Sequence, residues 1–91
     1  MNSHITDKFR KAFAELPADV RKQARQAYRL FIENPGHPSL RFKSIHPTRP
    51  IYSVRIGLDY RAVGVRAGDD IIWYWIGSHA DYNKLIRQFR K

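Results

Sequence analysis

The sequence predicts an α+β fold, in which an N-terminal helical hairpin packs on a small antiparallel β-sheet of three to four strands and a short C-terminal helix follows. Two observations lead to this prediction. Apolar residues recur at helical spacing up to about residue 33 and at every second position from residue 40 onward. Short turn-forming connections separate the alternating segments, and such connections make neighbouring strands antiparallel. A chain of 91 residues is long enough for one such domain over residues 1–91.

The N-terminal third predicts the two helices of the hairpin. Residues 4–16 carry Ile5 and Phe9 one helical turn apart, with basic residues around them. Pro17 suits the first turn of a second helix, which we expect over residues 18–33. One side of this second helix is apolar and carries Val20, Ala24, Ala27, Tyr28 and Phe31.

The rest of the chain predicts the sheet and the last helix. Four segments alternate apolar and polar residues as half-buried strands do, over residues 40–45, 52–56, 60–66 and 71–76. Residues 77–80 are expected to form a small-residue loop, after which apolar spacing suits a short helix. Because the hairpin covers one face of the sheet, we expect the other face to stay available to a partner. Most of the run from Trp73 to Trp75 is expected to pack against the hairpin.

The charge balance points to an anionic partner. The chain has 17 Lys and Arg residues against 8 Asp and Glu residues, a formal net charge of +9. Such a field on a small protein attracts phosphate backbones or acidic surfaces. A basic sheet face with interleaved aromatic residues suits RNA, and the alternative is a solvated face with scattered cations. The predicted strand region carries one acid, Asp59, and six cations: Arg41, Lys43, Arg49, Arg55, Arg61 and Arg66.

His79 is the leading candidate for proton transfer, because imidazole exchanges protons in the physiological pH range. Asp81 and Tyr82 follow closely enough to orient it, and Arg61 is expected to stabilise negative charge on a phosphate. The alternative is a histidine with a purely structural role. His46, in a proline-flanked loop, is a second and weaker candidate.

The sequence also excludes several classes of site. Without cysteine, neither a disulfide framework nor a thiolate zinc site is available. The HExxH motif, the glycine-rich phosphate loop and clustered carboxylates are missing as well, so no metal or other cofactor is expected. No apolar run approaches the roughly 20 residues of a membrane span, and we expect a cytoplasmic protein with no membrane partner.

Several short segments, taken together in order and spacing, resemble a known family. They are Asn34–Pro35, Leu40–Lys43, Tyr52–Ile56, Tyr60–Arg61 and Ile76–Tyr82. This set is similar to the RelE/ParE superfamily of toxins from type II toxin–antitoxin systems, and in particular to its RelE/HigB/YafQ-like branch. The resemblance covers essentially the whole chain and implies the small RelE-like α+β fold.

The resemblance implies a ribosome-dependent, metal-independent endoribonuclease that cuts mRNA on the 70S ribosome and inhibits translation. It also implies a cognate antitoxin protein, with contact to operator DNA only through that antitoxin. Two alternatives stay open. One is a ParE-like inhibitor of DNA gyrase without catalysis, and the other is a catalytically inactive RelE-fold binding protein.

The resemblance also implies roles for particular residues. His79 falls where relatives carry a histidine or arginine that moves a proton, and Arg61 matches the central strand arginine that stabilises the phosphate. Arg55 and Tyr82 complete the expected catalytic set. Ser53 stands where RelE has a lysine, so the cationic cluster is thinner than in that enzyme. The residues expected to bind RNA are Lys43, Arg41, Arg49, His46 and Ser53.

Overall fold

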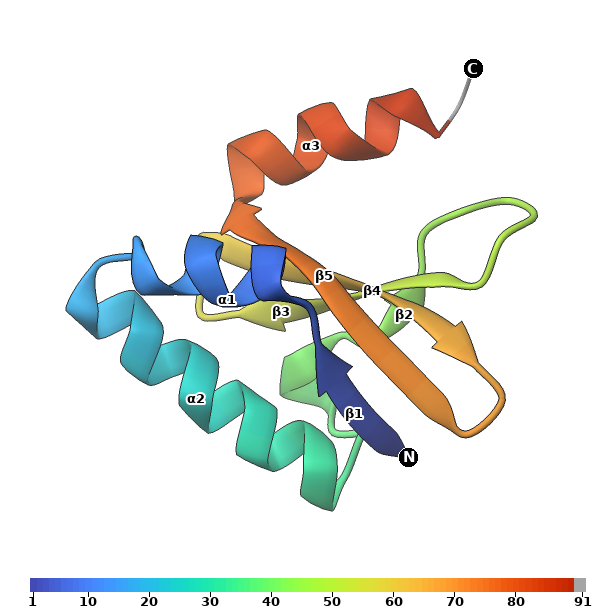
Figure 1. Ribbon diagram of the computed structural model, residues 1–91, viewed down its shortest axis with the longest axis horizontal. Coiled ribbons are helices and arrows are strands. Elements are labelled where there is room, and N and C mark those ends of the chain that lie inside the picture. Colours follow the sequence, from blue (N-terminus) through green and yellow to red (C-terminus); the bar gives the residue numbers. More distant parts are fainter. Residues whose placement is uncertain (90–91) are drawn as a thin grey trace.

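The computed structural model describes residues 1–89 and contains a five-stranded sheet with helices on both of its faces (Figure 1). The fold is α+β, with the predicted helical hairpin at the N-terminus and the predicted helix at the C-terminus. In chain order the elements are β1 (Asn2–Ile5), α1 (Asp7–Ala14), α2 (Ala18–Glu33), the short 3-10 helix η1 (Pro38–Leu40), β2 (Lys43–Ser44), β3 (Ile51–Ile56), β4 (Tyr60–Ala67), β5 (Asp70–Ser78) and α3 (His79–Gln88).

The sheet has the strand order β1-β5-β4-β3-β2. The three pairings among β2, β3, β4 and β5 are antiparallel, as the short connections predict. The pairing of β1 with β5 is parallel, so the sheet is mixed and has one strand more than the sequence led us to expect. None of the helices within residues 1–89 is long and apolar enough to cross a membrane.

Strand β1 corrects the predicted first helix. Ile5 is a strand residue paired with Trp73, and α1 begins only at Asp7, after Thr6. The Thr6 hydroxyl accepts a hydrogen bond from the Phe9 backbone N–H at 3.1 Å and so caps the helix. The Ser3 hydroxyl accepts a bond from the Trp73 indole at 3.0 Å. The residues that hold β1 lie about 70 positions away in the chain, so local periodicity carries no signal for it.

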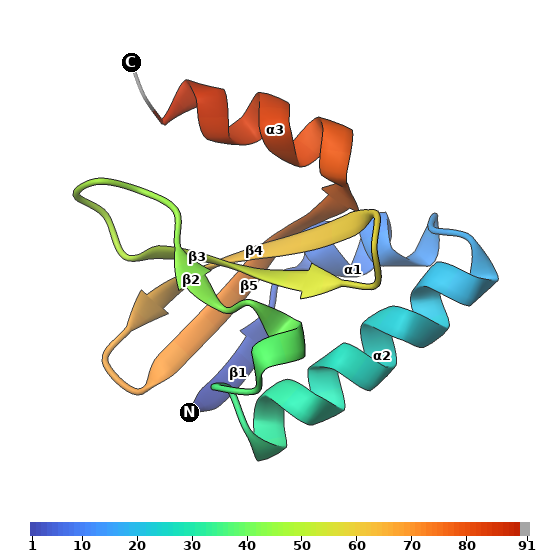
Figure 2. The ribbon, with the colours of Figure 1, turned by 180° about the vertical axis from the view of Figure 1, so that it is seen from behind.

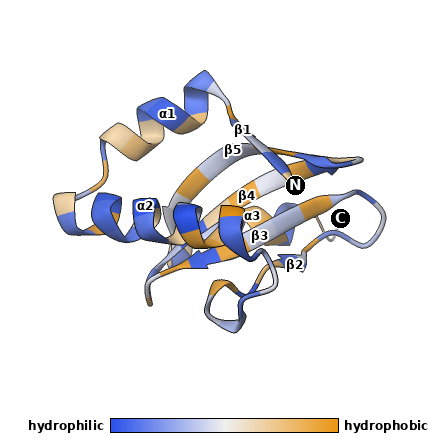
Figure 3. Ribbon diagram, turned by 90° about the horizontal axis from the view of Figure 1, so that it is seen from below, coloured by the Kyte–Doolittle hydropathy of each residue, from blue (hydrophilic) through white to orange (hydrophobic). Residues whose placement is uncertain are grey.

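The face of the sheet toward α1 and α2, which we call the hairpin face, contains the larger apolar core. Phe31 of α2 is 2% exposed and meets Trp73 and Phe42 edge-on, at ring-centroid distances of 5.3 and 5.1 Å. Val54 and Ile56 point into the same cluster from β3. In Figure 3 the central strands carry much of the hydrophobic colour, whereas α1 and α2 alternate between hydrophilic and hydrophobic residues. The amphipathic hairpin therefore buries its apolar side on this face.

The opposite face, which we call the α3 face, is partly covered by α3. Figures 1 and 2 show α3 on the side of the strands away from α2. Tyr82 of α3 packs with Val63 and Ile51 in a second buried cluster. Tyr74 and Trp75 pack against this cluster, whereas Trp73 lies in the hairpin core. The expectation of an uncovered second face was thus wrong in part, because the last helix folds back over it.

Two further boundaries differ from the prediction. The strand expected over residues 40–45 shrinks to β2, because η1 precedes it and Arg41 has a left-handed backbone with φ of 46° that breaks strand pairing. The loop expected at residues 77–80 is wrong, since β5 continues to Ser78 and α3 starts at the next residue. The Ser78 hydroxyl accepts a 3.1 Å hydrogen bond from the Asp81 N–H and caps α3.

Candidate functional site

Arginines gather on the α3 face. Arg55 and Arg61 are direct partners across β3 and β4, so their side chains leave the sheet on the same side. Burial, together with the charges of Arg55 and Arg41, lowers the pKa of Arg61, and Tyr82 acts in the opposite direction. These three arginines are therefore close enough to repel one another, which makes the cluster favourable for a bound anion.

No acid neutralises this arginine cluster among the described residues. Within residues 1–89 the ion pairs are His4–Asp70 and Arg10–Asp7, both outside the cluster. Two hydrogen bonds to backbone oxygens fix the arginine side chains instead: Arg55 donates to Gly57 at 2.9 Å, and Arg61 donates to Tyr60 at 3.1 Å. The guanidinium groups are thus positioned by the strands that carry them and keep donors for a ligand.

Tyr82 is buried next to the arginine cluster. Its side chain is 4% exposed, and the Arg61 guanidinium lies 5.8 Å from the ring centroid. Its hydroxyl is 3.1 Å from the hydroxyl of Ser53, which is 1% exposed on β3. Ser53 was expected to touch RNA, but it is buried and its hydroxyl faces Tyr82. Its role in this arrangement is to hold the tyrosine.

His79 lies beside the same tyrosine. It is the first residue of α3 and is exposed, and its ring centroid is 5.9 Å from that of Tyr82. Arg61 and His79 therefore border one ring, although one comes from a central strand and the other from a helix start. The carboxylate of Asp81 makes no hydrogen bond or ion pair with the described part of the chain, so here it does not orient His79.

The remaining predicted RNA-binding residues divide into two groups. Arg41 belongs to the arginine cluster and is exposed. Lys43 is also exposed and pairs with Ser53 across β2 and β3, on the same face of the sheet. His46 and Arg49 lie in the loop after β2. The His46 ring is 5.2 Å from the Phe89 ring, between centroids. The loop thus lies at the other end of α3 from His79.

Gly77 is a site residue that the reasoning about function missed. It pairs with Arg61 on the α3 face, and a Cβ placed on it would come within 2.8 Å of the Trp75 indole. A glycine here leaves room for that indole, whose ring centroid is 6.4 Å from that of Tyr82. A lone glycine inside a strand often marks such a close approach, and that signal was present in the sequence.

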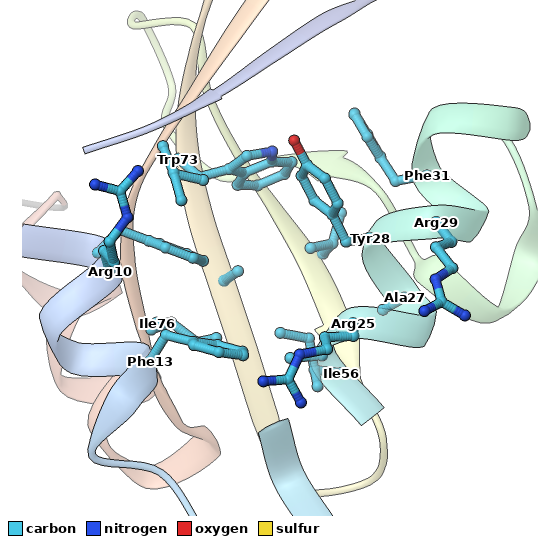
Figure 4. A pocket seen from close by; sticks show the side chains of 15 residues that line it. Arg10, Phe13, Arg25, Ala27, Tyr28, Arg29, Phe31, Ile56, Trp73 and Ile76 are labelled. Atoms are coloured by element: carbon cyan, nitrogen blue, oxygen red, sulfur yellow. The ribbon is translucent and has the colours of Figure 1, made fainter. Parts of the chain in front are cut away.

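A hollow on the hairpin face, which we call the hairpin groove, lies between α1, α2 and the sheet. It has a volume of about 430 Å³ and a mainly apolar lining (Figure 4). Tyr28, which is 39% exposed, and Phe13 border it. Arg10, Arg25 and Arg29 add positive charge to its lining, and Arg25 lies 5.2 Å from the centroid of the Phe13 ring. The helical spacing of residues 4–33 gave no sign of an opening here.

Comparison with known proteins identifies the family. Residues 18–84 match the ParE-like toxin domain family. The chain belongs to this family. The predicted membership of the RelE/ParE superfamily is thereby confirmed, and the matched range contains every residue of the arginine cluster, together with Tyr82 and His79. A search among curated proteins found no match.

Solved structures share the fold of this toxin domain. The RelB–RelE antitoxin–toxin complex from Methanococcus jannaschii matches with a TM-score of 0.72 and 19% identity, covering 90% of this chain and 96% of that one. The RelE–RelB complex from Pyrococcus horikoshii gives 0.67 and 17%, covering 85% and 92%. YafQ from E. coli gives 0.68 and 12%, covering 89% and 96%. At these identities the likeness establishes the RelE-like fold.

Proposed function

We propose that this toxin domain is a metal-independent endoribonuclease that cuts mRNA on the ribosome and so inhibits translation. The observation that carries the proposal is the un-neutralised arginine cluster of Arg41, Arg55 and Arg61, which shares one tyrosine with the exposed His79. Clustered guanidinium groups stabilise the charge that develops on a phosphate, and imidazole transfers protons at physiological pH. The presence of both kinds of group beside Tyr82 supports the proposal.

The proposed reaction uses the substrate's own 2′-hydroxyl as the nucleophile. Its oxygen attacks the adjacent phosphorus, the bond from phosphorus to the 5′-oxygen breaks, and a cyclic 2′,3′-phosphate and a 5′-hydroxyl result. His79 shuttles the proton from the attacking oxygen toward the leaving oxygen. Arg61 and Arg55 stabilise the negative charge on the phosphate oxygens, while Lys43 and Arg41 attract the backbone. Tyr82 is a positioning residue, because its buried ring borders both His79 and Arg61.

The test is cleavage of a defined mRNA on purified ribosomes, read by primer extension. Arg61→Ala is expected to slow cleavage by about 10²–10³-fold, the usual cost of one stabilising donor. His79→Ala is expected to slow it by about 10²–10⁴-fold. Arg66→Ala is the matched control, since Arg66 lies on the same strand but near Tyr52 of the hairpin face, and it should cleave normally.

Three outcomes would contradict the proposed nuclease. They are growth arrest with intact mRNA, full activity of His79→Ala, and an equal loss in the Arg66→Ala control. Accumulation of DNA gyrase cleavage complexes would select the gyrase inhibitor instead. Inactivity toward both targets, with antitoxin binding retained, would select the inactive binding protein.

We further propose that the partner of this toxin domain is a cognate antitoxin, which in turn makes any contact with operator DNA, and that both act in the cytoplasm. The two archaeal structures of similar fold are complexes of a RelE toxin with its RelB antitoxin. The hairpin groove suits an amphipathic antitoxin segment, because an apolar lining with three arginines complements apolar anchors and acidic side chains.

Copurification with the neighbouring gene product tests this partner assignment. Tyr28→Glu places a negative charge in the groove and is expected to weaken the complex at least tenfold. Ile72→Glu changes a residue of similar exposure, 37% against 39%, on the far side of the sheet and should leave binding unchanged. If both variants bind as tightly as the unmodified protein, the groove is not the antitoxin site.

A further inference from the structure

A second pocket adjoins the arginine cluster, and the reaction proposed above makes no use of it. This α3 pocket lies between the segment of residues 43–47 and α3, and its volume is about 490 Å³. Ile86 and Phe89 of α3 line it, as does Tyr82. Tyr82 therefore belongs both to this pocket and to the cluster that is proposed to hold the scissile phosphate.

One wall of the α3 pocket is aromatic. The His46 and Phe89 rings lie 5.2 Å apart between centroids with an interplanar angle of 55°, so they form adjoining surfaces with no room for a ligand between them. Both side chains are half-buried. Aromatic surfaces of this kind bind any nucleobase by stacking, so discrimination between bases depends on hydrogen bonds to the base edge and on the shape of the pocket.

His46 is held in a fixed orientation. Its Nδ1 accepts the backbone N–H groups of Arg49 at 2.9 Å and of Thr48 at 3.1 Å. Because Nδ1 is an acceptor, the neutral ring carries its proton on Nε2, which remains a donor for a ligand. The ring is thus both a stacking surface and a hydrogen-bond donor, and a base edge offers matching acceptors.

Positive charge connects the pocket to the arginine cluster. Lys43 lines the pocket and is the cross-strand partner of Ser53, whose hydroxyl contacts Tyr82. A phosphate bound by Arg61 and Lys43 would therefore have a neighbouring nucleotide over the pocket opening. An apolar peptide would leave this lysine unmatched, whereas a nucleotide matches both the charge and the aromatic wall.

We propose that the α3 pocket is a base subsite, which binds the base of a nucleotide next to the scissile phosphate and sets the preference of cleavage for that base. This inference rests on the proposed nuclease function and adds specificity-determining residues to it. His46 and Phe89 contact the base by stacking, and Ile86 sets the depth of the pocket. None of the three takes part in proton transfer.

The first experiment measures base preference. Ribosomes programmed with mRNA of randomised sequence are treated with the toxin, and the cleavage ends are sequenced. His46→Ala removes the ring together with its Nε2 donor, and Ile86→Trp fills the pocket. Each is expected to reduce the preference at one position beside the cut by about 5- to 100-fold, the scale on which a specific base contact discriminates between bases. The matched control is His37→Ala, because His37 caps its own turn through a 3.2 Å bond to the Ser39 N–H but lies outside the pocket.

The second experiment measures binding without cleavage. A short RNA with 2′-O-methyl groups at every position cannot react, and its binding is followed through the ring resonances of His46 and Phe89. The expected result is a shift of both sets of resonances in the unmodified protein, and the loss of the Phe89 shift in Ile86→Trp. The shift should persist in His79→Ala, whose proton-transfer group is missing but whose pocket is intact.

These experiments separate the two proposals. Cleavage with an unchanged base preference in both pocket variants would overturn the subsite and leave the nuclease standing. Absence of cleavage together with shifted His46 and Phe89 resonances would overturn the nuclease and leave a base-binding pocket. A preference that changes equally in His37→Ala would overturn the subsite, because that change would not depend on the pocket.

Discussion

The two faces of the sheet are made from alternating residues of the same strands, yet they differ in composition. From β3, Val54 and Ile56 enter the hairpin core, whereas Ser53 and Arg55 point to the α3 face. The hairpin face contains aromatic rings that meet edge-on in an apolar cluster. The α3 face contains arginines of like charge, without an acid within salt-bridge distance among residues 1–89.

The difference shows how one face supports the other. Like charges placed opposite each other in a sheet lower stability. The buried aromatic core on the hairpin face offsets that cost and keeps β3 and β4 in register, so that Arg55 and Arg61 stay opposite each other. A site held on strands in this way is positioned before any ligand arrives.

The largest loss of stability is expected from a substitution in the core of the hairpin face. Phe31→Ala removes a side chain that is 2% exposed and contacts two other rings, so the free energy of unfolding should fall by about 3–5 kcal/mol. Urea unfolding followed by tryptophan fluorescence measures it. The neighbouring Ile32→Ala is the control, since Ile32 is 54% exposed and its change should stay within about 0.5 kcal/mol. Equal losses in the two variants would contradict the assignment of the core.

A smaller loss of stability is expected when the buried hydrogen bond on the α3 face is removed. Ser53→Ala or Tyr82→Phe removes one partner of a buried hydrogen bond and should lower the free energy of unfolding by about 1–3 kcal/mol. The double variant should cost less than the two single changes together, because the second change no longer leaves a buried hydroxyl without its partner. Strict additivity in this double-mutant cycle would mean that the two hydroxyl groups do not interact.

The smallest expected effect depends on pH. Burial raises the pKa of Tyr74 on the α3 face above that of a free tyrosine. The contribution of its neutral form to stability is complete below the unfolded-state pKa of about 10 and is lost as pH rises through the folded-state pKa. Tyr74→Phe should therefore lose less stability than the unmodified protein between neutral and strongly alkaline pH. Parallel pH curves for the two proteins would show that Tyr74 ionises as freely in the folded chain as in the unfolded chain.

The elements that the sequence predicted well are those whose signal is local. Helix α2 has the predicted bounds, and β3 and β4 have the predicted bounds to within one residue, because alternation and turn residues act within a few positions. The meeting of Arg55 and Arg61 follows from the same signals, since a short turn forces their strands to pair. The two arginines of the candidate site that lie on β3 and β4 could therefore be placed opposite each other from the sequence alone.

The misplaced parts depend on distant contacts. Strand β1 forms only because the edge of β5 is available to it, and the short run from Asn2 to Ile5 carries no alternation of its own. The start of α3 at His79 required knowing that β5 continues to Ser78, which pairs with Tyr60 at the start of β4. Strand β2 is shorter than predicted because Arg41 has a left-handed backbone, and the alternation of apolar and polar residues does not reveal backbone conformation.

The sequence by itself determined the fold class, the family resemblance and the excess of positive charge, because composition, periodicity and short motifs are local properties of the chain. Only the tertiary structure decided that α3 folds back over the charged face. That placement buries the Ser53–Tyr82 pair, sets His79 and Arg61 beside one ring, and forms one side of the α3 pocket next to His46. The physical reason is that the position of α3 is chosen by packing between residues far apart in sequence, such as Tyr82 with Val63 and Ile51.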